Sequence, residues 1–476
     1  DVPFENFCQE LKKAAAYSTY KPSVVVRQIA PEKYASIQEK LFKLKGFYSQ
    51  PRTLREYPVP SAAHVLGYVG EVTQDLIDTD RYYQSGDYIG ISGIESSYEE
   101  DLRGEKGVKY YMVDVHNRIQ GSYRNGEADT VAHIGRNLIT SLDIDLQQYA
   151  ELLLRNKRGS VVAIEPSTGE ILALANSPSY DPNLLVGRER GKNYALLIDD
   201  PLLPLFNRAL MAQYPPGSTF KMAQALVALQ EGAITPFTRF YCSHGYSSGN
   251  LRIGCHHSQA FELEGSIAQS CNAYYVYVFR AILENTKYND IRKAYDAWRE
   301  QMMRFGFGRT LGSDIPNELK GIIPSSDYFQ KNVFRGSRWR ALPIASLSIG
   351  QGEIGITPFQ LANYAAMIAN RGYYYIPHIV KEIEKKETSG RFRERVESGI
   401  NREYFDPVIN GMEKAMQPGG TAGRSMIPEI PACGKTGTAQ NPHGADHSVF
   451  MAFAPKDNPQ IAISVYVENG IWGATY

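Results

Sequence analysis

The sequence predicts an α/β protein whose catalytic region has a central antiparallel sheet flanked by helices. Two strand-like runs, 160–166 and 170–176, are joined by Ser167-Thr-Gly169, a turn sequence. Two further runs, 448–454 and 460–467, close the chain, and helical patterns lie between the two pairs. Strands at both ends of a region with helices between them are typical of a layered α/β domain.

The 476 residues are enough for two or three domains, and we place one boundary near residue 137. Residues 1–137 begin with helical patterns at 6–16 and 31–43 and continue with strand-like runs at 55–60, 64–69 and 109–115. This region carries no catalytic constellation, so we expect a β-rich, non-catalytic pedestal. The catalytic domain is expected over 138–476, opening with a helix from about Thr140 to Asn156.

Composition excludes some classes of function. Lys plus Arg and Asp plus Glu both number 51, so the chain lacks the basic excess typical of nucleic-acid binding. No stretch approaches the roughly 18 consecutive apolar residues of a transmembrane helix, and no signal peptide is visible. The sequence begins at Asp1 without an initiator methionine, which we interpret as a fragment of a longer protein.

The first chemical motif is Ser218-Thr-Phe-Lys221. The preceding Tyr214-Pro-Pro-Gly217 cannot be helical throughout, whereas 219–232 reads as an almost wholly apolar helix. Ser218 therefore lies at a helix N-terminus with Lys221 one turn further on the same face. A lysine in apolar surroundings loses proton affinity, so we interpret Ser218 as a nucleophile and Lys221 as its base. Taken alone, the motif would more often be an N-cap serine and a solvated lysine; the other two motifs favour the catalytic interpretation.

The second motif is Ser270-Cys-Asn272, expected on a loop that lines the same pocket. Ser270 is a candidate for passing a proton from Lys221 to a leaving group, and Asn272 for holding a substrate amide. The alternative without a catalytic role is that this motif is only a helix N-cap.

The third motif, Lys435-Thr-Gly-Thr438, lies on a candidate strand at 432–440. Alternation places Thr436 and Thr438 on one face and Lys435 on the other. Gly437 allows a substrate backbone to approach the strand, while the threonines bind a carboxylate and Lys435 adds positive potential. The N–H groups of Ser218 and Thr438 are candidates for an oxyanion hole. The alternative without a catalytic role is an ordinary edge strand in which Lys435 stands beside residues of high β propensity.

All three motifs in this order form the signature of penicillin-binding proteins and related β-lactamases. The chain resembles class B penicillin-binding proteins, which are peptidoglycan D,D-transpeptidases, from about Arg55 to its end. The resemblance includes Tyr214-Pro-Pro-Gly-Ser218, the stretch 350–359 and Phe453-Ala-Pro455. Further stretches are similar to the elongation (rod-complex) subtype, penicillin-binding protein 2, with the septal subtype as the neighbouring alternative: 141–147, 178–183, Gly420-Thr-Ala422 and Val467-Glu-Asn-Gly470.

The resemblance implies a penicillin-binding/β-lactamase-like transpeptidase domain on a pedestal of the dimerisation type. It implies that Ser218 attacks the D-Ala-D-Ala amide of a stem peptide, that a second stem's amine resolves the acyl-enzyme, and that β-lactams acylate Ser218. It also implies an N-terminal membrane anchor outside this fragment, a location at the periplasmic face of the inner membrane, and a role in cell-wall elongation and cell shape. The implied partners are a membrane glycosyltransferase and other elongation-complex proteins.

Two other classes of function compete with this interpretation. A D,D-carboxypeptidase or β-lactamase would use water as its acceptor, but no Glu-x-x-Leu-Asn match lies between Ser270 and Lys435, which favours transpeptidation. A penicillin-recognising sensor or an inactive scaffold is the alternative outside catalysis. The intact set of Ser218, Lys221, Asn272 and Lys435 disfavours an inactive scaffold.

Five cysteines are too few for a disulfide scaffold. The spacing of Cys242, Cys255, His256 and His257 fits a structural zinc site. It fits a Cys242–Cys255 disulfide or free thiols as well. Cys271 is expected only to pack within the second motif, and no cofactor is required for the expected reaction.

Overall fold

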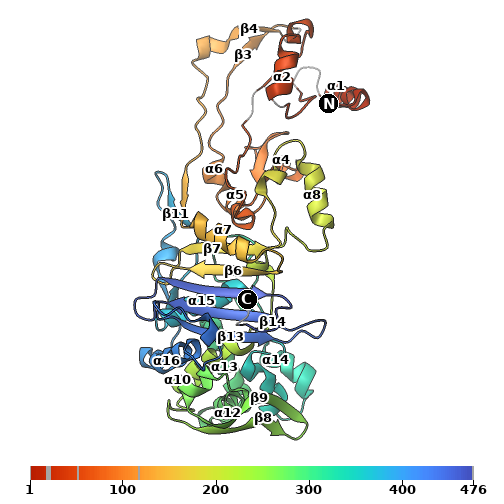
Figure 1. Ribbon diagram of the computed structural model, residues 1–476. Coiled ribbons are helices and arrows are strands. Elements are labelled where there is room, and N and C mark those ends of the chain that lie inside the picture. Colours follow the sequence, from red (N-terminus) through yellow and green to blue (C-terminus); the bar gives the residue numbers. More distant parts are fainter. Residues whose placement is uncertain (1, 18–22, 30, 51–52, 116–117, 474–476) are drawn as a thin grey trace. The chain divides into compact units, whose positions relative to one another are not determined.

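The computed structural model describes residues 2–17, 23–29, 31–50, 53–115 and 118–473, and it divides the chain into two compact units (Figure 1). The first unit comprises 1–137 together with 180–201, and the second comprises 138–179 together with 202–476. The segment 180–201 joins the first unit through Asn183, whose side chain donates to Tyr57 O at 2.9 Å and accepts from Tyr57 N at 3.1 Å.

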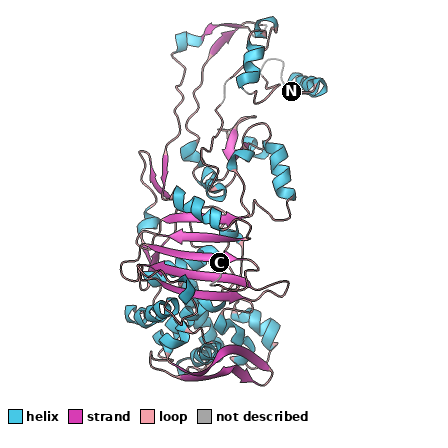
Figure 2. Cartoon of the chain, in the orientation of Figure 1, coloured by secondary structure: helices cyan, strands magenta, loops and turns pink. Residues whose placement is uncertain are grey.

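The first unit holds short elements rather than a large sheet (Figure 2). The predicted helix at 6–16 is confirmed, and the one predicted over 31–43 is divided into an α-helix at 31–38 and a 3₁₀ turn at 41–43. The predicted strands at 55–60 and 64–69 are wrong. Proline lacks the amide that a ladder needs, and Pro58 and Pro60 interrupt the first run. The second run forms a helical turn that Gly67 ends at φ +80°. Its elements are α1 Phe4–Tyr17, α2 Pro31–Gln38, η1 Leu41–Lys43, α3 Ala63–Leu66, β1 Val69–Glu71, α4 Gln74–Thr79, β2 Tyr88–Gly90, α5 Gly93–Ser97, α6 Glu99–Leu102, β3 Tyr111–Val113, β4 Ile119–Ser122, η2 Tyr123–Gly126, η3 Pro182–Leu185 and α8 Arg190–Asp199.

The second unit is built on a five-stranded sheet in the order β13-β14-β15-β6-β7, with every neighbouring pair antiparallel. The strands are β6 Gly159–Ile164, β7 Ile171–Ser177, β13 Cys433–Ala439, β14 His447–Ala454 and β15 Ile461–Val467. The expected hairpin and the strands that close the chain are therefore confirmed, and segments about 300 residues apart in sequence meet where β15 pairs with β6.

Helices cover this sheet because its strands present apolar side chains on both faces. The buried helix α15 (Pro358–Ala369) packs against β14, β15 and β6, and Ser464 Oγ donates to Pro358 O at 2.6 Å. Helix α7 (Ile144–Leu153), capped by the Asp143 carboxylate, packs against β7. The other elements are η4 Gly217–Phe220, α9 Arg208–Met211, α10 Lys221–Gln230, β8 Phe240–Ser248, β9 Leu251–Phe261, α11 Leu263–Ala268, α12 Asn272–Leu283, η5 Thr286–Tyr288, α13 Ile291–Arg304, α14 Ser326–Phe329, the π-helix η6 Gln330–Phe334, η7 Leu342–Ile349, β5 Leu138–Thr140, β10 Tyr373–Tyr375, β11 Val380–Ile383, η8 Gly390–Arg393, β12 Arg395–Glu397, η9 Arg402–Tyr404, α16 Phe405–Met416 and η10 Gly423–Ser425.

Within the described ranges, no helix combines the length and apolar character needed to cross a membrane.

Candidate active site

Ser218 lies in a tight turn that continues directly into an apolar helix. The 3₁₀ turn η4 begins at Gly217, which has φ +56°, and Lys221 N–H donates to Ser218 O where η4 meets α10. The predicted helix over 219–232 is therefore present, with a 3₁₀ first turn. Ser218 is partly exposed, whereas Lys221 is fully buried. The turn thus presents the hydroxyl to solvent and buries the amine beneath it.

The Lys221 amine is held by three acceptors from the second motif. Its Nζ lies 2.7 Å from Ser270 O, 3.1 Å from Ser270 Oγ and 2.6 Å from Asn272 Oδ1. Burial lowers the pKa of Lys221 to about 8, although the nearby cysteines act in the opposite direction. A lysine with such a pKa is partly neutral near physiological pH, as a general base must be.

Lys435, on the edge strand β13, also contacts Ser270. Its Nζ lies 2.9 Å from Ser270 Oγ and 2.8 Å from Thr436 O, and the side chain is fully buried. Burial, and then the charge of Lys221, lower the pKa of Lys435 well below its usual value. Two ammonium groups sharing one hydroxyl in a buried site repel each other, so the pair favours a single positive charge. Ser270 Oγ therefore bridges two amines between which a proton can pass.

Local backbone structure places Ser270 and Asn272. Ser270 has φ +53° in the break between α11 and α12, and Cys271 is the N-cap of α12. Asn272 Nδ2 donates to Gly254 O at 2.7 Å, which ties the motif to strand β9. Both ends of the Asn272 side chain are thus occupied, one by Lys221 and the other by β9.

Strand β13 is an edge strand, and its residues alternate as predicted: Lys435 is buried, while Thr436 and Thr438 are partly exposed. Thr438 O accepts from Gln351 Nε2, a group outside the sheet, at 2.8 Å. Because the N–H and C=O of one residue in an antiparallel strand point to the same side, the Thr438 N–H also faces the open edge.

Turn η4 lies directly against this edge. A Cβ added to Gly217 would stand 2.4 Å from Thr438 O, and one added to Gly437 would stand 3.0 Å from Pro216 O. Only glycine permits this approach, which brings the backbones of the first and third motifs together. Among the described residues, none makes a hydrogen bond to Ser218 Oγ, so the turn holds the nucleophile through its backbone alone.

Sequence reasoning missed two supporting residues. Gly350 O accepts from Gly217 N at 2.9 Å, and Gln351 accepts from Gln440 N as well as donating to Thr438 O. Both lie in the stretch 350–359 that contributed to the family resemblance. No spacing rule connects that stretch to Ser218 or Thr438.

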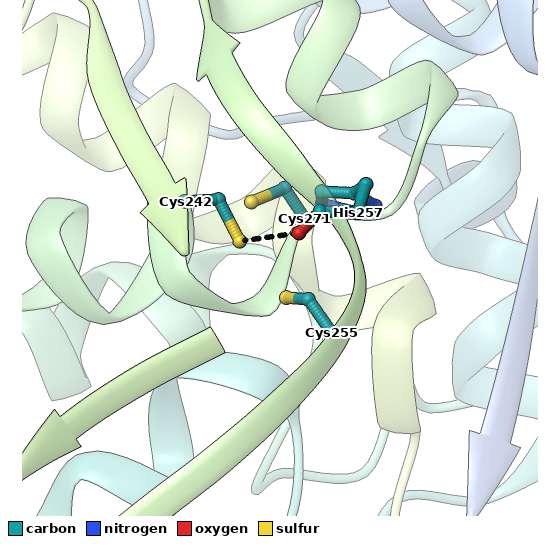
Figure 3. Close-up of side chains that lie close together, drawn as sticks. All are labelled: Cys242, Cys255, His257 and Cys271. Atoms are coloured by element: carbon teal, nitrogen blue, oxygen red, sulfur yellow. Dashed lines mark hydrogen bonds between the residues drawn. The ribbon is translucent and has the colours of Figure 1, made fainter. Parts of the chain in front are cut away.

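A cluster of cysteine and histidine side chains lies beside the second motif (Figure 3). The potential ligand atoms of Cys242, Cys255, His257 and Cys271 lie within 4.8 Å of one another. The prediction is corrected in two respects: exposed His256 is outside this group, and Cys271 belongs to it rather than only packing. All five cysteines are free thiols, so Cys242 and Cys255 form no disulfide.

The cluster holds a polarised thiol. Hydrogen bonds, first from Cys271 and then from the backbone amides of Ala273 and Asn272, lower the pKa of Cys255 to about 5. By contrast, the hydrogen bond with Cys255 and burial raise the pKa of Cys271. These hydrogen bonds thus favour the thiolate at Cys255 and the thiol at Cys271.

Comparison with known families covers nearly the whole chain. Residues 159–475 match the family described as penicillin-binding protein transpeptidase domain, and residues 3–138 match the penicillin-binding protein dimerisation domain.

Curated relatives and solved structures agree with these matches. Peptidoglycan D,D-transpeptidase MrdA of Acinetobacter baumannii is 34% identical over 93% of this chain and 67% of its own length. The MrdA protein of Escherichia coli K12 is 32% identical over 87% of this chain and 68% of its own length. A Helicobacter pylori complex of penicillin-binding protein 2 with MreC matches all of this chain and 90% of that chain, with 27% identity and a TM-score of 0.83. Pseudomonas aeruginosa penicillin-binding protein 2 in complex with WCK 5153 matches 90% of this chain and 88% of that chain, with 32% identity and a TM-score of 0.74.

Proposed function

This chain belongs to the penicillin-binding protein transpeptidase family, and on that premise we propose that Ser218 carries the acyl-enzyme of a peptidoglycan D,D-transpeptidase that acts in cell-wall elongation. The observation that carries the residue assignment is the continuous set of contacts Asn272–Lys221–Ser270–Lys435 beneath an accessible Ser218. These contacts supply a base and a proton path in one buried site.

In the proposed acylation, neutral Lys221 takes the proton of Ser218 Oγ as that oxygen attacks the carbonyl of a D-Ala-D-Ala amide. The N–H groups of Ser218 and Thr438 stabilise the developing oxyanion, an effect of about 2.7–4 kcal/mol per donor in comparable sites. Ser270 passes the proton from Lys221 toward the departing D-Ala amine. The hydroxyls of Thr436 and Thr438 bind the terminal carboxylate, near the positive charge shared by the two lysines.

Acyl transfer to a second stem repeats these steps in reverse. The acceptor amine attacks the acyl carbon, its proton passes to Lys221, and Ser218 regains a proton as the ester bond breaks. β-Lactams present the same carbonyl geometry to Ser218 and acylate it as substrate mimics.

The proposed setting is the periplasmic face of the inner membrane, with an N-terminal anchor preceding this segment. The proposed partners are a membrane glycosyltransferase and other elongation-complex proteins. Structural relatives support that choice, because one is a complex of penicillin-binding protein 2 with MreC and another is a peptidoglycan synthase complex that couples polymerization to crosslinking.

Release of D-Ala tests the proposed activity. Purified protein incubated with a pentapeptide stem and an amine acceptor should release one D-Ala for each cross-link formed. Release without a cross-linked product at high acceptor concentration would identify a carboxypeptidase instead. Absence of release would contradict the enzyme assignment.

We expect acylation by a β-lactam to slow as the pH falls through about 8. The reason is that Lys221 must be neutral to act as a base, and burial lowers its pKa to about 8. The groups facing its amine include Lys435 from β13 and the cysteines beside α12. Below the midpoint the rate should fall about tenfold per pH unit, because the neutral fraction falls tenfold. A stopped-flow pH profile measures this, and a flat profile between pH 6 and 9 would contradict the base assignment.

The Cys242–Cys255–His257–Cys271 cluster fits a structural zinc ion. Three sulfur donors and one imidazole form a Cys₃His set of the kind that closes tetrahedral zinc sites. Moreover, the buried Nε2 of His257 lacks a hydrogen-bond partner among the described residues. Bound zinc would link the β8–β9 hairpin to Cys271, between Ser270 and Asn272, and would hold that motif in place without entering the reaction.

We therefore expect about one equivalent of zinc in protein purified without chelators, and loss of that zinc in Cys271→Ser. Metal analysis and thermal unfolding measure the effect, and the midpoint of unfolding should fall when the metal is removed. Cys433→Ser is the matched control, because Cys433 is a buried thiol outside the cluster. Equal metal content in both variants would exclude this site.

A further inference from the structure

A cavity of the second unit lies outside the proposed catalytic machinery. It has a volume of about 650 Å³ and lies at one end of the central sheet. The residues that line it include Lys157, Arg158, Ser177, Leu202, Glu468 and Asn469. Its walls come from the turn between α7 and β6, the end of β7 and the segment that follows β15.

Two residues that line the cavity, Val467 and Ser177, lie in the same row of paired residues as Thr438 of β13. Backbone pairing runs straight across the sheet from Thr438 to Ser448, Val467, Gly159 and Ser177. Neighbouring strands stand about 4.8 Å apart, so Val467 is about 10 Å and Ser177 about 19 Å from Thr438 along this row. Figure 1 shows the same order of strands, with β13 and β7 at opposite edges of the sheet.

A buried network connects the cavity to the nucleophile's turn. Glu468 accepts from Tyr214 OH at 2.7 Å, and Tyr214 stacks on Tyr466 with ring centroids 3.8 Å apart. Arg208, 1% exposed, holds the same carboxylate at 3.4 Å. Tyr214 precedes Ser218 by four residues, so the cavity wall and the catalytic turn form one packed assembly.

The cavity lining carries more positive than negative charge. Among the lining residues, Arg158 lies 3.3 Å from Glu468 and pairs with the single carboxylate of the lining. Lys157, whose amine also donates to Leu153 O at 2.6 Å, gives the lining one more positive than negative charge, while Asn469 and Ser177 add amide and hydroxyl groups. Arginine and lysine with neighbouring amides are the side chains that bind carboxylates.

We propose that this cavity is the acceptor subsite, which binds the carboxylates of the incoming stem peptide while its free amine reaches the acyl-enzyme on Ser218. The proposal rests on the proposed transpeptidase function. A stem of three to five residues spans at most about 10–17 Å, which reaches from Thr438 to the Val467 side of the cavity, about 10 Å away along the row of strands. In the transfer step, the amine nitrogen bonds to the acyl carbon, the Ser218 Oγ–carbon bond breaks, and the amine proton returns to Ser218 through Lys221.

The test separates the acceptor from the donor half-reaction. The enzyme is acylated by a D-Ala-terminated thioester, and transfer is measured to two acceptors: an anionic stem tripeptide with a free side-chain amine, and neutral glycinamide. In Lys157→Glu we expect the tripeptide concentration for half-maximal transfer to rise at least about tenfold through charge repulsion. Transfer to glycinamide and acylation by a β-lactam should stay within about twofold of the parent protein. Leu202→Trp, which fills the cavity without changing charge, should reproduce the selective loss.

Lys331→Glu is the matched control, because Lys331 is an exposed lysine of the same unit outside this cavity, and it should behave like the parent. An unchanged tripeptide dependence in both cavity variants would overturn the proposal. Equal losses for tripeptide and glycinamide, or slower acylation, would also overturn it, since the cavity would then serve another step. Failure of the parent protein to acylate at all would instead refute the proposed function.

Discussion

Replacing Lys221 by alanine is expected to slow acylation of Ser218 by about 10²–10⁴-fold, the usual range for loss of a general base. The amine is fully buried, and its hydrogen bonds with Ser270 and Asn272 hold it in place. Stopped-flow acylation with a fluorescent penicillin gives the rate directly.

The control for this variant is Lys331→Ala, which removes an exposed lysine of the same unit and should leave the rate unchanged. Thermal unfolding of Lys221→Ala distinguishes a catalytic loss from a folding defect. A folded variant that acylates within threefold of the parent rate would show that Lys221 is not the base.

Replacing Gly217 by alanine is the second change with a large expected effect. The new Cβ would stand 2.4 Å from Thr438 O, and Gly217 has φ +56°, so η4 must move away from β13. That movement separates the two oxyanion donors, and loss of one such donor costs about 10²–10³-fold in comparable enzymes. The acylation rate at saturating β-lactam measures the effect.

Gly232→Ala is a closely matched control. Gly232 also has a positive φ, +65°, but a Cβ there would meet nothing within 4 Å. Backbone strain alone should therefore destabilise both variants, whereas only Gly217→Ala should lose acylation. Equal acylation rates in the two folded variants would contradict the close approach of Ser218 and Thr438 as the source of oxyanion stabilisation.

The parts of the site that sequence predicted are those fixed by local geometry. Ser218 and Lys221 are one helical turn apart, and Thr436, Gly437 and Thr438 alternate along one strand, so periodicity alone places them. The central hairpin and the closing strands followed from the same rules. By contrast, nothing local indicates that Gln351 binds Thr438 or that Glu468 binds Tyr214, because those contacts depend on tertiary packing.

The cysteine cluster, too, could be predicted from sequence only where its members lie close together along the chain. Spacing brought Cys242, Cys255 and His257 together because they lie on one hairpin, β8–β9. The same spacing also suggested His256 as a ligand, but adjacent residues of a strand point to opposite faces, so His256 points away from His257. Cys271 was missed because it reaches the cluster from the N-cap of a different element, α12. In the first unit, strand propensity at 64–69 was overridden by a helical turn before Gly67.

The most direct test of the account is the intact mass of the protein after incubation with a β-lactam, beside Ser218→Ala. We expect a long-lived adduct of one drug mass on the parent protein and none on the variant. An adduct that persists in Ser218→Ala, or intact drug and no adduct with the parent protein, would contradict Ser218 as the acylated nucleophile. Rapid drug hydrolysis without an adduct would contradict transpeptidation and identify a β-lactamase.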